Sequence, residues 1–71
     1  MIKDKRDDKF EKLLLYYKKN INVHLILKST EWLNGILIEV EENYIMINEF
    51  KKGVMPVLMN EISEIAPYIE K

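Results

Sequence analysis

The sequence predicts a mainly β domain in which one N-terminal α-helix precedes a five-stranded, strongly bent antiparallel barrel. From Val23 to Leu27 every second residue is a valine or a leucine. Period-two alternation of this kind is typical of a strand that buries one face. The following apolar run contains Gly35, and a glycine inside a strand usually marks a bulge or a tight bend. We therefore expect the sheet to curl at this point into a small barrel.

Residues 8–19 are predicted to form an amphipathic helix that follows a charged tail over residues 1–7. Asp8 and Glu11 have the spacing of a capping box, with Asp in place of the usual Ser or Thr. Lys18 and Lys19 suit the negative end of the helix dipole, and Asn20 can end the helix in a left-handed conformation. One apolar stripe, at positions i, i+3, i+4 and i+7, consists of Phe10, Leu13, Leu14 and Tyr17. The helix is expected to lay this stripe across the open end of the barrel.

Five short strands are predicted after the helix, with polar or glycine-containing turns between them. They cover residues 21–28, 32–41, 44–49, 54–59 and 62–67. Pro56 cannot donate to a hydrogen-bonded ladder, so the fourth strand is expected at an edge of the sheet or with this residue near its start. The chain shows no repeat or linker, so residues 8–71 are expected to form one domain, with the barrel over residues 21–67.

The small size of this domain indicates association between copies. A domain of this length buries only about 60% of the surface that its unfolded chain exposes, and small domains usually gain stability from disulfides, metals or oligomerisation. The sequence has no cysteine, and its single histidine, His24, has no second type of metal ligand beside it. Because 48% of the residues are nevertheless hydrophobic, a homo-oligomer is expected.

Several functional classes are disfavoured by the residues that the sequence lacks. It has no glycine-rich phosphate loop, no nucleophile with a base at a plausible spacing and no acid pair suited to catalysis. We therefore expect no enzymatic activity, no cofactor and no metal site. The absence of cysteine fits a reducing cytoplasm, and the charged N-terminus lacks the apolar stretch of a signal peptide or membrane span. A cytoplasmic protein without membrane contact is expected.

Charge is distributed unevenly along the chain, although the formal net charge is −1. Residues 1–20 carry seven basic and four acidic side chains, whereas residues 21–71 carry four basic and eight acidic ones. This asymmetry fits a basic helix-bearing face and an acidic barrel, or alternatively an ordinary solvated surface.

The order of these elements, together with four stretches of sequence, carries a resemblance to a known family. The stretches are residues 21–27, the run Leu33-Asn34-Gly35 followed by Val40-Glu41, the third strand from Tyr44 to Ile47, and the closing residues 61–67. With these features, residues 10–67 resemble the Sm-like family, and within it the bacterial Hfq type. The resemblance implies a ring of several copies, joined edge to edge by the fourth and fifth strands, that binds single-stranded RNA.

The resemblance also implies that two loops lining the central pore hold the bases. Glu41 and Glu42 would place negative charge around this pore, so we expect the basic helix-side rim to make more of the RNA contact. The residues expected to contact RNA are Lys12, Lys18, Lys19, Asn43, Tyr44 and Asn60. Each also has a structural interpretation: lysines solvate a helix, asparagines favour turns, and Tyr44 can pack within the barrel or a ring interface.

Two other functions remain open at this point. The first is an oligomeric Sm-like scaffold that binds proteins and has lost RNA recognition, and the second is a monomeric SH3-like barrel. The solution mass distinguishes a ring from a monomer. Of the remaining conspicuous side chains, Trp32 is either part of the core or a partial surface anchor, with packing favoured, and His24 is expected to face outward without binding a metal.

Overall fold

The computed structural model describes residues 8–69, and the predicted charged tail lies outside them. Helix α1 (Asp8–Lys18) is followed by strands β1 (Val23–Leu27), β2 (Trp32–Val40), β3 (Tyr44–Glu49) and β4 (Gly53–Leu58). A short 3₁₀ helix, η1 (Met59–Glu61), then leads into β5 (Ile62–Pro67). The predicted fold class, a helix followed by five antiparallel strands, is therefore confirmed.

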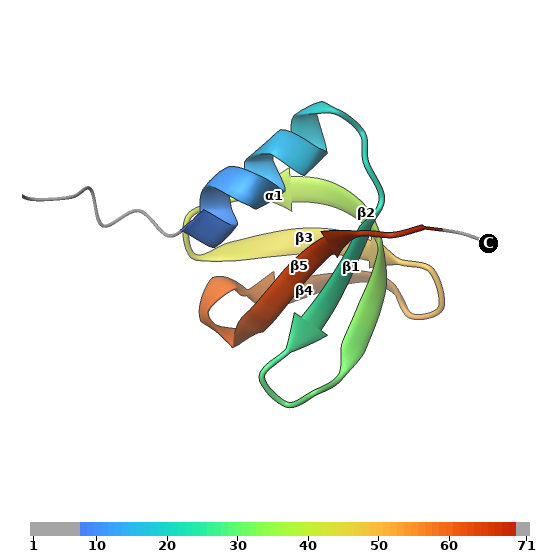
Figure 1. The fold of residues 1–71 in the computed structure, drawn as a ribbon. Coiled ribbons are helices and arrows are strands. Elements are labelled where there is room, and N and C mark those ends of the chain that lie inside the picture. Colours follow the sequence, from blue (N-terminus) through green and yellow to red (C-terminus); the bar gives the residue numbers. More distant parts are fainter. Residues whose placement is uncertain (1–7, 70–71) are drawn as a thin grey trace, which may run out of the picture.

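The five strands form one strongly bent antiparallel sheet in the order β4-β3-β2-β1-β5 (Figure 1). Among the described residues, no ladder joins β4 to β5, so the sheet curls without closing and these two strands are its edges. The proline-containing fourth strand therefore lies at an edge, as predicted. The pairing register shifts between Leu37 and Glu39 in β2 and between Ile26 and Leu27 in β1.

Gly35 does not mark the bulge that the sequence predicts at this position. The register shift in β2 lies beyond it, whereas Gly35 itself pairs regularly with Val23 and Glu49. A side chain at this position would collide with β3, because its Cβ would lie 2.8 Å from Glu49 Cα and would also overlap the Asn48 carbonyl oxygen. Glycine is needed here for close backbone approach rather than for an unusual dihedral angle.

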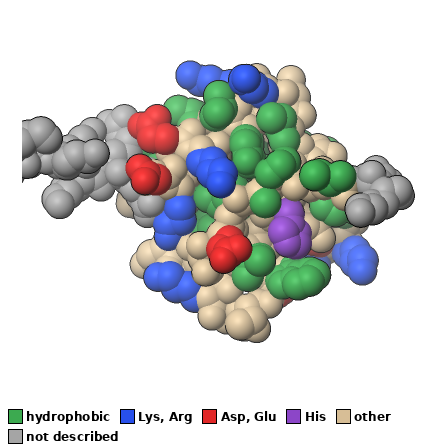
Figure 2. Space-filling model, viewed as in Figure 1, with side chains coloured by type: hydrophobic (Ala, Val, Ile, Leu, Met, Phe, Trp, Pro, Cys, Tyr) green, Lys and Arg blue, Asp and Glu red, His purple; other side chains and the backbone are tan. Residues whose placement is uncertain are grey.

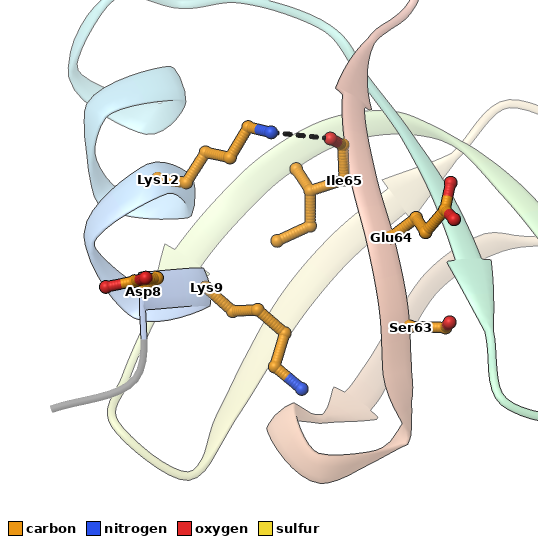
Figure 3. A pocket seen from close by; sticks show the side chains of 6 residues that line it. All are labelled: Asp8, Lys9, Lys12, Ser63, Glu64 and Ile65. Carbon is orange, nitrogen blue, oxygen red and sulfur yellow. Dashed lines mark hydrogen bonds between the residues drawn. The ribbon is translucent and has the colours of Figure 1, made fainter. Parts of the chain in front are cut away.

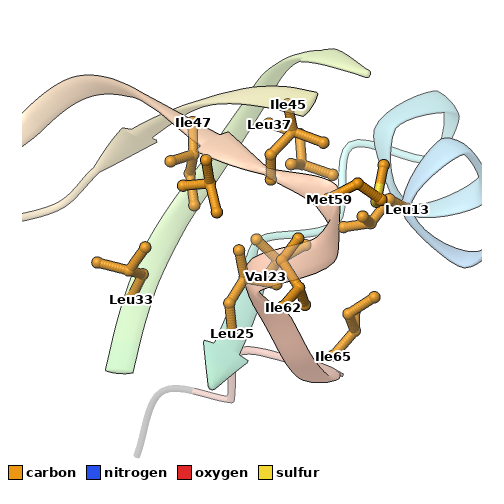
Figure 4. Close-up of a cluster of buried hydrophobic side chains, with 11 residues drawn as sticks. Leu13, Val23, Leu25, Leu33, Leu37, Ile45, Ile47, Met59, Ile62 and Ile65 are labelled. Carbon is orange, nitrogen blue, oxygen red and sulfur yellow. The ribbon is translucent and has the colours of Figure 1, made fainter. Parts of the chain in front are cut away.

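The core fills the inside of the curled sheet and continues beneath α1 (Figure 4). Its largest fully buried side chains come from the helix, from β1 to β3 and from the start of β5. They are Leu13, Val23, Leu25, Leu33, Ile45, Ile47 and Ile62. The alternation read from the sequence thus identifies Val23 and Leu25 correctly as the inward face of β1.

Helix α1 lies across one end of the curled sheet and contacts β2 and β5 (Figure 1). Leu13 is fully buried, and Phe10 and Tyr16 pack against the core. The prediction that Tyr17 belongs to the buried stripe is wrong, since Tyr17 is 42% exposed and its neighbour Tyr16 takes the inner position.

The C-terminal end of α1 is close to the predicted one, since the helix ends at Lys18, one residue earlier than expected. Asn20 adopts the predicted left-handed conformation, with φ of 59°.

Candidate RNA-contacting residues and neighbouring surfaces

The helix-side lysines occupy two different environments. Lys12 Nζ donates a hydrogen bond of 2.9 Å to the Ile65 carbonyl of β5, and Lys9 Nζ donates one of 2.8 Å to the Ile62 carbonyl. Figure 3 shows the Lys12 ammonium reaching the Ile65 oxygen across a depression of about 380 Å³ between α1 and β5. Lys18 and the following Lys19 are exposed at the other end of the helix. Lys12 therefore covers part of a sheet edge, while Lys18 and Lys19 face solvent.

Asn43 and Asn60 come together although they are seventeen positions apart in the sequence. Both line one depression of about 380 Å³, together with Glu42, Leu58 and Met59. The Met59 N–H donates to the Asn43 carbonyl over 2.8 Å and so ties the two segments to each other. Both asparagine residues are exposed. This depression thus holds the two amide residues that were predicted from separate turns.

Tyr44 faces a group of carboxylates and does not line the depression that holds Asn43 and Asn60. Its hydroxyl donates to Glu39 Oε2 over 3.3 Å, and the negative charge of Glu39 raises the pKa of Tyr44. The pKa of Glu41 is raised as well, chiefly by a hydrogen bond with Glu39 and also by the nearby charge of Glu42. The end of the molecule beside the β2–β3 turn is therefore acidic, as the sequence suggests.

A cluster of aromatic residues that sequence reasoning missed lies around the β3–β4 turn. The aromatic cluster consists of Trp32, Phe50 and Tyr68, which line a depression of about 270 Å³ together with Asn34, Lys51 and Lys52. The prediction that Trp32 packs in the interior is wrong, because 64% of this residue is exposed. Its indole meets the His24 ring edge to face, with the centroids 5.3 Å apart. In Figure 2 the histidine, in purple, lies beside hydrophobic side chains at the surface.

Glu49 fixes the backbone of the turn beneath this cluster. It is only 6% exposed, and its two carboxylate oxygens accept the backbone N–H groups of Asn34, Lys51 and Lys52 over 3.1, 2.8 and 2.8 Å. These hydrogen bonds lower the pKa of Glu49 despite its burial, and the one from the Asn34 N–H has the largest effect. The buried carboxylate therefore links β2 to the β3–β4 turn through its hydrogen bonds.

The outer face of β2 and β4 is apolar and exposed. Ile36 and Ile38 from β2 and Val54, Pro56 and Leu58 from β4 all face solvent. β3 lies between these strands, with Asn48 opposite Ile36 and Val54, and Met46 opposite Pro56. β4 is apolar on both faces, so its sequence alone does not reveal which face is exposed.

Comparison with known proteins adds no relative: the sequence matches no protein-family model and no curated protein. The order of one helix and five antiparallel strands is compatible with an Sm-like fold. Within residues 8–69, no three histidine, cysteine, aspartate or glutamate side chains are grouped so that they could hold a metal ion. No helix in this part of the chain is long and apolar enough to cross a membrane.

Proposed function

We propose that this protein is an Sm-like module that binds single-stranded RNA. The observation that carries the proposal is the convergence of Asn43 and Asn60 in one exposed depression of about 380 Å³. Side-chain amides both donate and accept hydrogen bonds, so they can pair with the edges of unstacked bases. The depression also has an apolar wall, formed by Leu58 and Met59, against which a base can pack.

Cationic attraction for the phosphates is assigned to the helix side of the molecule. Lys18 and Lys19 are exposed there, and phosphate neutralisation by lysine supplies most non-specific affinity for nucleic acid. Lys12 contributes less in this scheme, since its ammonium already donates to the Ile65 carbonyl. The carboxylates of Glu39, Glu41 and Glu42 repel phosphate, so the backbone of the RNA passes on the lysine side.

Assembly into a ring through β4 and β5 is part of the same proposal. Each of these strands has a neighbour on one side only in the part of the chain that the structure describes. Pairing β4 of one copy with β5 of the next would give both edges a partner, as closed assemblies require. Repetition around the ring would multiply the weak contacts of each lysine pair and each amide pair.

Fluorescence anisotropy with labelled U-rich and A-rich oligonucleotides, at low and moderate salt, tests the binding. The wild-type protein should bind at low salt and more weakly at moderate salt. Asn60→Ala should weaken binding about 5-fold, as expected for the loss of a base-edge contact worth about 1 kcal/mol. Asn48→Ala removes an exposed amide from the outer face of β3 and should leave the affinity unchanged. Absence of binding by the wild type at either salt concentration would refute the proposal.

The alternative function, a scaffold for proteins, is favoured by the outer face of β2 and β4. Ile36, Ile38, Val54 and Leu58 are between 43% and 60% exposed, and exposed apolar side chains gathered on one face are typical of interaction sites. A partner that is retained after nuclease treatment, lost in Ile36→Lys and kept in Asn60→Ala would support the scaffold over RNA binding.

A further inference from the structure

The aromatic cluster has no part in the contacts proposed above, yet its geometry suits a ligand. Its three rings come from the start of β2, the β3–β4 turn and the segment after β5, and they line one depression of about 270 Å³. We propose that this depression stacks unpaired bases of single-stranded RNA. The inference rests on the proposed function, because it assigns a second contact surface to the same ligand.

Ring contacts hold the exposed aromatic side chains in defined orientations. The indole of Trp32 and the ring of His24 cross at 78°, and Phe50 meets Tyr68 at 65° with the centroids 5.4 Å apart. His24 Nδ1 is in turn hydrogen-bonded to Asn34 Oδ1 on the neighbouring strand. Trp32 and Phe50 nevertheless stay 64% and 48% exposed. Exposed aromatic rings on a β-sheet surface are the platforms on which single-stranded nucleic acids stack their bases.

The backbone beneath the cluster is fixed before any ligand arrives. The Phe50 N–H donates to the Asn34 carbonyl over 2.8 Å, so the β3–β4 turn is tied to β2 beside Trp32. The buried Glu49 carboxylate holds the next two residues of the turn through their N–H groups. A preorganised site loses little conformational entropy on binding, which favours even a small contact surface.

The charges around the depression favour an anionic ligand over a cationic one. Lys51 and Lys52 both line it, and within residues 8–69 the Lys51 ammonium forms no ion pair. Lys52 pairs with Glu31, and the oxygens of Glu49 already accept three N–H groups. An ammonium ligand would therefore meet lysines and an occupied carboxylate. A nucleotide places its base on the rings and its phosphate near Lys51.

Trp32 provides a direct probe, because it is the only tryptophan of the chain. Its intrinsic fluorescence is followed during titration with a short oligouridylate, alongside the anisotropy of the same labelled strand. Base stacking should quench Trp32 over the concentration range in which the anisotropy rises. An abasic strand of equal length and charge should leave the fluorescence unchanged. Equal quenching by the abasic strand would overturn the inference.

Two substitutions test the platform without removing core residues. Trp32→Ala and Phe50→Ala should each weaken RNA binding about 5- to 100-fold, the range expected for loss of one stacked base. Ile38→Ala is the matched control, because this residue is 43% exposed on a different part of β2 and should keep full affinity. Circular dichroism and urea unfolding establish that each variant is folded.

The outcomes separate this inference from the function on which it rests. If the wild type binds RNA without quenching of Trp32, and folded Phe50→Ala binds equally well, the platform is refuted and the proposed function stands. If the wild type binds no RNA, both are refuted.

Discussion

At the scale of single residues, Glu49 is the clearest case of a charge used for structure. A carboxylate that is 6% exposed would be costly without partners, but three backbone N–H groups compensate for its burial. Those groups belong to β2 and to the β3–β4 turn, so one side chain ties two elements together. Sequence pattern does not reveal this role, because a lone glutamate at a strand end is normally solvated.

Glu49→Gln should lower the free energy of unfolding at pH 7 by about 2 kcal/mol, because an amide keeps only one acceptor oxygen and its NH2 group cannot accept the remaining N–H. Since folding lowers the pKa of Glu49 below its ordinary value of 4.5, its contribution is fully present above that value and lost as the pH falls through the lowered pKa. Urea unfolding of both proteins from pH 7 to pH 3 measures this. Glu64→Gln, at an exposed position, is the control. If the free energies of unfolding of the wild type and Glu49→Gln differed by the same amount from pH 7 to pH 3, the role assigned to the Glu49 charge would be contradicted.

Gly35 carries the second prediction at this scale. Gly35→Ala should destabilise the fold by about 1–3 kcal/mol, because the new methyl group would force β2 away from the backbone of Asn48 and Glu49. Gly53 offers a contrast, since nothing lies within 4 Å of a Cβ there and only its φ of +85° restricts the residue type. Because asparagine tolerates positive φ, Gly53→Asn should lower the free energy of unfolding by less than Gly35→Ala does. Thermal unfolding of both variants measures the difference, and equal losses would show that crowding is not the reason for Gly35.

At the scale of elements, Leu13 is the one residue of α1 that is fully buried against the sheet, and Phe10 and Tyr16 pack beside it. Leu13 is fully buried in the common core, whereas Leu15 is 48% exposed on the same helix. Leu13→Ala should lower the stability by about 2–5 kcal/mol, and Leu15→Ala should change it by less than about 0.5 kcal/mol. Urea unfolding of the two variants checks this pair. A similar loss of stability in the two variants would mean that the helix packs differently from the arrangement in Figure 1.

Sequence pattern predicts the existence and order of the elements better than the details of their packing. The alternation in β1 identifies Val23 and Leu25 as core because strands have a strict period of two. The helix is less constrained, since its period of 3.6 leaves both Tyr16 and Tyr17 near the edge of the stripe, and contact with the sheet decides between them.

The structure brings only some of the predicted site residues together, for physical reasons that single positions illustrate. Asn43 and Asn60 meet because both flank the β3–β4 ladder, which strand order alone can suggest. Trp32 precedes the buried Leu33, so alternation places it outward, but tryptophan's large apolar area suggested the interior. The engagement of Lys12 with Ile65 depends on how closely α1 approaches β5, a distance that no sequence pattern encodes.

At the scale of the whole molecule, the two sheet edges differ chemically. Because the Met59 N–H points to Asn43, alternation directs the backbone groups of Val54, Pro56 and Leu58 away from β3, toward the free edge of β4. Pro56 removes the central donor of that edge, so only Val54 and Leu58 can donate to a neighbouring strand. On the other edge, the carbonyls of Ile62 and Ile65 already accept lysine ammonium groups. Each edge therefore keeps only part of its capacity to pair with another strand, and this limits the hazard of edge-to-edge aggregation.

If copies pair through β4 and β5, the Leu58 N–H is one of the few donors that hold them together. Leu58→Pro removes this donor without straining the backbone, because the φ of −71° at Leu58 already suits proline. Leu58→Ala removes the same exposed side chain but keeps the N–H group. Multi-angle light scattering should give a mass of several times 8.5 kDa for the wild type and for Leu58→Ala, and a mass shifted toward 8.5 kDa for Leu58→Pro. A wild-type mass of 8.5 kDa would exclude the ring, and equal masses for the two variants would mean that assembly uses a surface other than the β4 edge.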